Sequence, residues 1–132
     1  MDFSGEYIKD IFVGKVWIKK ATFIEAEQFR ILLSNAMNNE IKKYIIDLSG
    51  CISIDPIFIG VIIQTYKKLI NINGNLKIVR PKFAVHSNQS FENSLRIFEI
   101  YLSIEEAIES YRKIFVKPTE ELIANRVPLA LT

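Results

Sequence analysis

Short apolar segments rich in isoleucine and valine alternate along this sequence with longer amphipathic segments. Residues 42–48 (KKYIIDL) and 75–80 (NLKIVR) have the length and β-branched composition of buried strands. Each follows a longer segment in which apolar residues recur every three or four positions, as on one face of a helix. Strands joined by a helix pair in parallel, because the chain crosses over the sheet between them. The pattern therefore predicts an α/β fold with helices packed on a mostly parallel sheet.

The first part of the chain is predicted to form a hairpin and a helix. Residues 6–19 alternate loosely around the sequence VGK (residues 13–15), which predicts a two-stranded hairpin that turns there. Thr22 and Glu25 then form a capping box, in which each side chain accepts a hydrogen bond from a free backbone N–H. We expect a helix from Thr22 to about residue 39, with Phe23 on its buried face.

A second helix is predicted to begin at Asp55 and Pro56. The carboxylate of Asp55 can cap the first turn, a contribution of about 1 kcal/mol, and proline is tolerated at the first helical position. Asn73 and Gly74 are suited to end this helix, because both residues tolerate the left-handed conformation.

The C-terminal part adds three smaller elements. The sequence predicts a short helix over 91–97, a strand over 98–101 and a helix over 104–115 that begins with a Ser103–Glu106 capping box. The expected order is ββαβαβαβα, with four or five strands and about four helices. A chain of 132 residues suits one domain, which we place at 1–116, with 117–132 as a tail that would hold one more short helix.

Composition limits the classes of partner. Seventeen basic and fifteen acidic residues are interleaved and leave a net charge of +2, which gives no basic surface for nucleic acid. The apolar runs are shorter than the roughly 20 residues that cross a bilayer, and the acidic N-terminus is unlike a signal peptide. The sequence therefore predicts a cytoplasmic protein that binds neither nucleic acid nor membrane.

Few residues are arranged for chemistry. His86 and Cys51 are the only histidine and cysteine, and their separation fits no metal-binding spacing. The five glycines form no phosphate-binding loop. Glu105, Glu106 and Glu109 lie in the first turns of a predicted helix, where they complement its dipole. A reactive thiol at Cys51 lacks a neighbouring base in the sequence. We therefore expect no metal, no cofactor and no enzymatic activity.

The second helix carries an apolar stripe on the side opposite its predicted core face. Spacing at 100° per residue predicts a core face formed by Ile59, Ile62, Ile63, Tyr66, Leu69 and Ile70. The outward stripe consists of Ile57, Val61, Gln64 and Lys68, with Phe58 and Thr65 at its edge. Because exposed apolar residues cluster at the helix start, a partner-binding patch is predicted there, unless the tail or a loop covers it. Its candidate residues are Ser53, Asp55, Pro56, Ile57, Phe58, Val61 and Gln64.

Residues 6–115 resemble a STAS domain, the module shared by bacterial anti-sigma factor antagonists and the cytoplasmic ends of sulfate transporters. The most specific part is residues 44–74, YIIDLSGCISIDPIFIGVIIQTYKKLINING. This segment is similar to the family pattern of an apolar strand, Asp-Leu-Ser-Gly, a short loop, an aspartate, a small polar patch, a glycine and an amphipathic helix. The resemblance implies a STAS-like α/β sandwich.

The resemblance also implies a phosphorylation switch that this chain lacks. In the family, a hydroxyl after the loop aspartate is phosphorylated by an anti-sigma factor that is also a kinase, and the antagonist then releases its partner. Asp55 matches that aspartate and Gly60 the later glycine, but Pro56 and Ile57 replace the hydroxyl pair and Phe58 replaces the first glycine. The usual acceptor is therefore missing.

Two upstream hydroxyls, Ser53 and Ser49, are weak substitutes for that acceptor. The resemblance thus implies a non-catalytic module that binds a kinase-type anti-sigma factor through residues 51–61, without a phosphorylation switch. Two alternatives stay open. One is a sensor that holds a small molecule or nucleotide between Thr22 and residues 49–55, and the other is self-association as a homodimer or scaffold component.

Overall fold

A computed structural model describes residues 2–81, 93 and 95–113. Its main sheet has five strands in the order β1-β2-β4-β6-β7, and β3 and β5 form a separate two-stranded sheet. β1 pairs with β2 antiparallel, and the other pairs are parallel. The predicted α/β fold with a mostly parallel sheet is confirmed. The elements are β1 (Phe3–Ile8), β2 (Ile11–Val16), β3 (Lys20–Ala21), α1 (Phe23–Asn38), β4 (Lys43–Asp47), β5 (Ser53–Ile54), α2 (Pro56–Ile70), β6 (Asn75–Val79), β7 (Glu99–Tyr101) and α4 (Ile104–Arg112).

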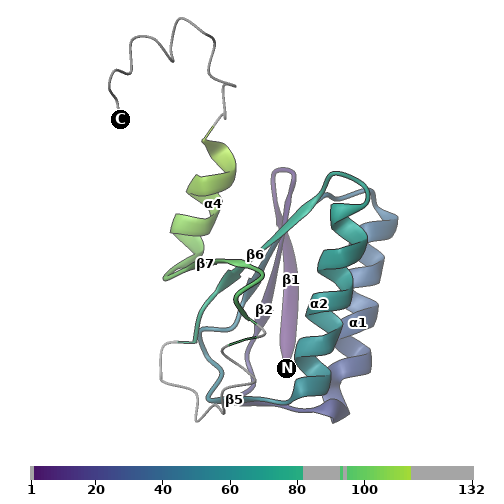
Figure 1. Cartoon of the computed structure of the whole chain (residues 1–132), viewed down its shortest axis with the longest axis vertical. Helices are drawn as coiled ribbons and strands as arrows, with labels where there is room; N and C mark the ends of the chain where they lie inside the picture. The colour runs from purple at the N-terminus through teal and green to yellow at the C-terminus, as the bar shows by residue number, and fades with distance from the viewer. Residues whose placement is uncertain (1, 82–92, 94, 114–132) are drawn as a thin grey trace, which may run out of the picture.

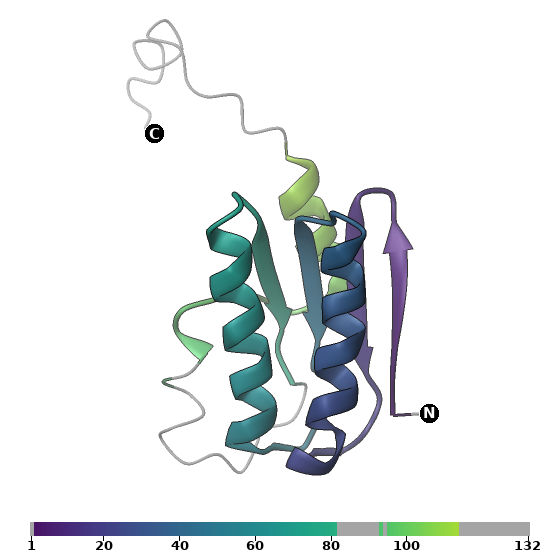
Figure 2. The ribbon, with the colours of Figure 1, turned by 90° about the vertical axis from the view of Figure 1, so that its right-hand side faces the viewer.

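The helices lie on both faces of the main sheet. α1 and α2 run side by side over one face, and α4 lies on the other (Figures 1 and 2). The central strand β4 is buried on both sides: Tyr44 and Ile46 belong to the core under α1 and α2, and Ile45 belongs to the smaller core under α4. This explains why the sequence of β4 is apolar throughout and does not alternate with polar residues.

The hairpin turn lies earlier than the sequence predicts. β1 and β2 are joined at Lys9 and Asp10, where Lys9 adopts a φ of 57°, and the VGK sequence lies inside β2. β2 pairs with β1 on one side and with β4 on the other, so Gly14 belongs to a continuous buried strand. The prediction of a turn at Gly14 was wrong because that pairing depends on residues far away in the sequence.

The helix starts form largely as predicted. Thr22 and Glu25 make the full capping box of α1, and Asp55 Oδ1 accepts a 2.7 Å hydrogen bond from the Ile57 N–H ahead of α2. At α4, Ser103 Oγ accepts from the Glu106 N–H, but the Glu106 carboxylate accepts from the Leu102 N–H. The predicted box at Ser103 is therefore only half formed.

Helix ends depart slightly from the expected positions. α2 ends at Ile70, and Asn73 then takes the left-handed conformation expected of it, with a φ of 63°. α4 ends at Arg112, a little short of the prediction. The predicted helix over 91–97 is described only at residues 93 and 95–97, and His86 and the tail lie outside the described residues, so the tail and the domain boundary at 116 stay predictions. In the part of the chain that is described, no helix has the length and apolar character needed to cross a membrane.

Candidate functional site

The two-stranded sheet aligns the starts of α1 and α2. β3 and β5 pair in parallel, with Lys20 opposite Ser53 and Ala21 opposite Ile54. The Asp55 N–H also donates to the Ala21 carbonyl at 2.7 Å. Because each strand leads directly into the cap of its helix, α1 and α2 begin side by side at the same end of the molecule (Figure 2).

Four apolar residues are exposed where the two helices begin. Phe23 is 61% exposed, Ile24 72% and Ile57 59%, and Pro56 is exposed beside Ile57. We call Phe23, Ile24, Pro56 and Ile57 the helix-start patch. Exposed apolar residues that gather from two elements mark protein-binding surfaces more often than single ones do. The structure therefore places the predicted exposed Ile57 in a larger apolar surface than α2 alone provides.

Sequence reasoning missed the α1 half of the patch. Phe23 was expected on the buried face, but it precedes the first core residue of α1, Ala26, and lies in the exposed first turn. Ile24 was not singled out. The adjacency of the two helix starts follows from the strand order, because the segments joining β2 to β4 and β4 to β6 are successive crossovers in one direction and place both helices on the same face.

Phe58 is buried, contrary to the prediction that it is exposed. Its exposed fraction is 0%, and its ring stacks on Phe29 of α1 with 4.8 Å between centroids. Phe58 therefore joins α2 to α1 in the core, where a partner cannot reach its side chain. The prediction considered α2 by itself, whereas the neighbouring helix determines which side of the first turn is covered.

The other predicted partner-binding residues are placed unevenly. Ser53, Asp55 and Val61 are partly buried, and Val61 packs against the main core. The Asp55 carboxylate caps α2, so one of its oxygens is already engaged. Gln64 is exposed on α2, beyond the first two turns. Of the predicted set, Pro56 and Ile57 are thus the residues that the structure brings together with Phe23 and Ile24.

The remaining stripe residues show where helical spacing was insufficient. Thr65, expected at the edge of the outward stripe, is 5% exposed, and its hydroxyl donates to the Val61 carbonyl at 2.9 Å. Ile70, expected in the core, is half exposed because it lies at the very end of α2. Ile59, Ile62 and Leu69 are buried as predicted.

Charged groups of both signs lie around the helix-start patch. The positive ends of two helix dipoles meet there, and Lys19 and Lys20 are exposed just before α1. Two carboxylates oppose them. Asp55 caps α2, and hydrogen bonds from the Thr22 backbone and hydroxyl lower the pKa of Glu25. The patch itself consists of hydrocarbon groups, which can bind a partner but cannot transfer a proton or a chemical group.

Cys51 is unsuited to a reactive role. It is fully buried, and burial, with a smaller contribution from the charge of Asp47, raises the pKa of its thiol to about 12. The thiol is then protonated at neutral pH, and the thiolate is the nucleophilic form. Among the residues described, no group of three His, Cys, Asp or Glu side chains is placed to hold a metal ion.

The chain belongs to the STAS domain family, whose model matches residues 19–107. The match covers the two-stranded sheet, both helix starts and the strands β4, β6 and β7 of the main sheet. This confirms the family that the resemblance of residues 44–74 predicted.

Relatives within the family are named as anti-sigma factor antagonists. A Thermotoga neapolitana protein, named as a homologue of the anti-sigma factor antagonist TM1081, is 34% identical over 73 residues, which span 55% of this chain and 65% of that relative. The crystal structure of TM1081 from Thermotoga maritima has a TM-score of 0.71 at 27% identity, covering 84% of this chain and 95% of that one. The anti-sigma factor antagonist SpoIIAA, in its unphosphorylated form, has the same fold, with a TM-score of 0.69 at 16% identity over 85% of this chain and 99% of its own.

Proposed function

We propose that this protein is a non-catalytic anti-sigma factor antagonist that binds its partner through the helix-start patch. The observation that carries the proposal is the exposure of Phe23, Ile24 and Ile57 on two adjacent helix starts. Burying a large apolar side chain contributes about 1.5–3 kcal/mol, so three such anchors supply a substantial part of a binding energy. The names of the relatives support an anti-sigma factor as the partner.

The patch has no residue that could act as a phosphorylation switch in the usual position. A phosphoryl group at this helix start would add nearly two negative charges to an apolar contact and weaken it. Pro56 and Ile57 occupy the positions where related antagonists carry the hydroxyl pair, and neither side chain can be phosphorylated. Binding is therefore set by the concentrations of the protein and its partner, or by a regulator that acts elsewhere.

The alternative of a ligand between Thr22 and residues 49–55 receives less support. The Ile52 and Ser53 N–H groups both donate to the Lys19 carbonyl, at 2.6 and 3.0 Å, so backbone hydrogen bonds join the two segments directly. One hollow is lined by Ser49, but the other residues of its lining are Asp47, Val79 and residues 102–105, not Thr22. A small-molecule site is better sought away from the helix-start patch.

The test compares two double variants, each of which replaces two exposed isoleucines with glutamine. Ile24→Gln with Ile57→Gln removes two anchors from the patch, and Ile70→Gln with Ile72→Gln makes the same change at the far end of α2, where both residues are also exposed. Affinity purification from the source organism, with proteins identified by mass spectrometry, is expected to recover an anti-sigma factor with the wild type and with the Ile70/Ile72 variant. Recovery should fall at least tenfold with the Ile24/Ile57 variant, the equivalent of about 1.4 kcal/mol.

Two outcomes would contradict the proposal. Equal recovery of the anti-sigma factor by both double variants would place its binding site outside the patch. Failure of the wild type to recover any anti-sigma factor, while light scattering shows concentration-dependent dimers that the Ile24/Ile57 variant lacks, would assign the patch to self-association.

A further inference from the structure

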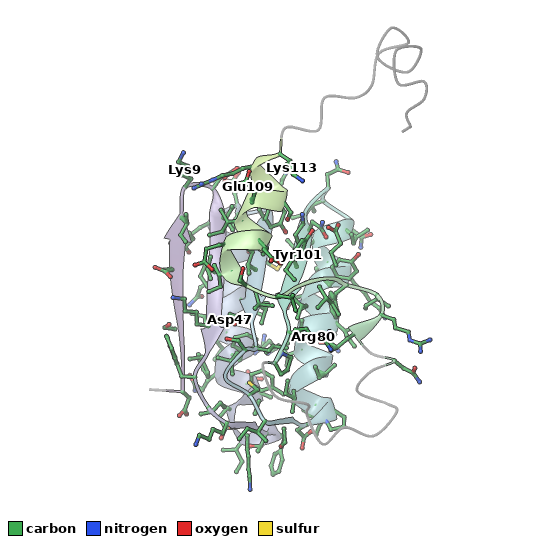
Figure 3. All side chains as sticks on the ribbon, turned by 90° about the vertical axis from the view of Figure 1, so that its left-hand side faces the viewer. Lys9, Asp47, Arg80, Tyr101, Glu109 and Lys113 are labelled. Atoms are coloured by element: carbon green, nitrogen blue, oxygen red, sulfur yellow. The ribbon has the colours of Figure 1, made fainter. Side chains whose placement is uncertain are left out.

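A second surface feature lies at the opposite edge of the main sheet from β1, beside β7 and the end of β6. It is a hollow of about 280 Å³ next to β7, which we call the arginine groove. Its described lining consists of Arg80, Leu95, Arg96, Ile100 and Leu102. Figure 3 labels Arg80 and Asp47, which lie at the carboxyl-terminal ends of β6 and β4.

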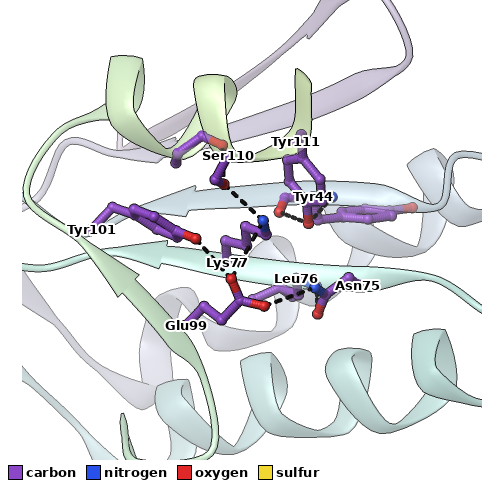
Figure 4. Close-up of polar contacts among 9 residues, drawn as sticks. Tyr44, Asn75, Leu76, Lys77, Glu99, Tyr101, Ser110 and Tyr111 are labelled. Atoms are coloured by element: carbon purple, nitrogen blue, oxygen red, sulfur yellow. Dashed lines mark hydrogen bonds and ion pairs between the residues drawn. The ribbon is translucent and has the colours of Figure 1, made fainter. Parts of the chain in front are cut away.

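The sheet fixes one side of the arginine groove. Arg80 directly follows β6, and its N–H donates to the Tyr101 carbonyl at 3.0 Å, which extends the pairing of β6 with β7. Within β7, Glu99 and Tyr101 approach Lys77 under α4, so Ile100 lies on the other face of the sheet (Figure 4). Arg80 and Ile100 are thereby held by strand pairing at neighbouring points.

The opposite side is formed by a turn that packs into the core. Leu95 is almost fully buried, and the Phe98 N–H donates to its carbonyl at 3.1 Å. The ring of Phe98 packs edge-on against Tyr66 of α2, with 5.0 Å between centroids. This anchoring holds Arg96, the residue after Leu95, at the rim of the groove.

The chemistry of this lining matches an anion that carries an apolar group. Its described side chains are two guanidinium groups and three hydrocarbon groups. The carboxylates of Asp47 and Glu105 line a neighbouring hollow that shares Leu102 with the groove. Guanidinium groups bind carboxylate and phosphate through paired hydrogen bonds. Leu102 is 69% exposed, so hydrocarbon that would otherwise contact water is available to an apolar tail. The volume, near the lower end of ligand pockets at about 300 Å³, restricts the ligand to a small one.

We propose that the arginine groove binds a small amphiphilic anion, a carboxylate or phosphate head on a short alkyl chain. The head lies between Arg80 and Arg96, and the chain covers Ile100 and Leu102. This site is separate from the helix-start patch and does not depend on the proposed binding of an anti-sigma factor. It would give the protein an input that is independent of phosphorylation.

The test is a titration of the full chain followed by heteronuclear NMR. Octanoate and octyl phosphate are the probes, and their relative affinities distinguish a carboxylate from a phosphate head. At least one probe should produce saturable shifts in the amides of Arg80 and residues 95–102. Inorganic phosphate and octanol, which carry the head and the tail alone, are each expected to bind at least tenfold more weakly.

A matched pair of arginine variants locates the site. Arg80→Gln with Arg96→Gln should weaken binding of the better probe at least tenfold, because both charged donors are lost. Arg30→Gln with Arg112→Gln removes the same charge from exposed positions on α1 and α4 and should leave the affinity unchanged. The proposal would be overturned if the wild type bound octyltrimethylammonium as tightly as the better probe, or if both double variants bound that probe equally well. It would also be overturned if neither probe produced saturable shifts.

Discussion

Ile57 and Phe58 are consecutive residues in the first turn of α2, yet one is 59% exposed and the other is fully buried. Phe58 stacks on Phe29 of the neighbouring helix, whereas Ile57 points away from the core. At the residue scale, the first turn of α2 therefore has two separate roles. Phe58 stabilises the fold, and Ile57 is available to a partner.

This division predicts different costs for two alanine substitutions. Phe58→Ala leaves a cavity beside Phe29 and should lower the free energy of unfolding by about 3–5 kcal/mol. Ile57→Ala removes an exposed side chain and should change it by no more than about 0.5 kcal/mol. Urea denaturation of both variants measures the difference. Similar losses in the two proteins would show that Ile57 is also part of the core.

At the element scale, α4 is attached to the sheet both by the smaller apolar core and by a set of polar contacts. Ala107 is its one fully buried residue, and beneath the helix Lys77 is only 6% exposed. Lys77 Nζ donates to Ser110 Oγ at 2.7 Å, forms a 3.4 Å ion pair with Glu99 and lies 4.1 Å from the centre of the Tyr111 ring (Figure 4). Lys77 thus joins α4 to both β6 and β7.

Replacing Lys77 should loosen α4 more than the rest of the fold. Lys77→Met keeps the length of the side chain but removes its charged hydrogen bond, which is worth about 1.5–3 kcal/mol. Amide hydrogen exchange in residues 107–111 should therefore accelerate roughly tenfold to a hundredfold, because each 1.4 kcal/mol is a factor of ten. The exposed Lys67→Met variant on α2 is the control. An equal acceleration in β4 and β6 would show that Lys77 stabilises the whole domain instead.

Elements set by local sequence were predictable, and those set by distant pairing were not. The caps at Thr22 and Asp55 follow from side chains within three positions of each helix start, and both form as predicted. β3 and β5 are two residues each, too short to show alternation, so their pairing was missed. The hairpin turn was also misplaced, because pairing with β4, which is distant in the sequence, makes Gly14 a strand residue.

At the scale of the whole molecule, the helix-start patch exists because two crossovers in one direction bring α1 and α2 to the same face (Figure 1). Pattern reasoning found Ile57 within one helix, but joining it to Phe23 and Ile24 requires the alignment through β3 and β5. The α/β class could be predicted from the order of elements. The extent of the exposed apolar surface could not be predicted, because it combines segments that are distant in the sequence.

The most direct measurement is hydrogen exchange on the complex with the recovered anti-sigma factor, in the presence of ATP and magnesium, with the mass of the intact protein recorded at the end. We predict slower exchange at residues 22–26 and 55–59, unchanged exchange in β7 and α4, and no added phosphoryl mass. Protection confined to β7 and α4 would contradict the account. Phosphorylation of Ser49 or Ser53 that dissociates the complex would also contradict the account.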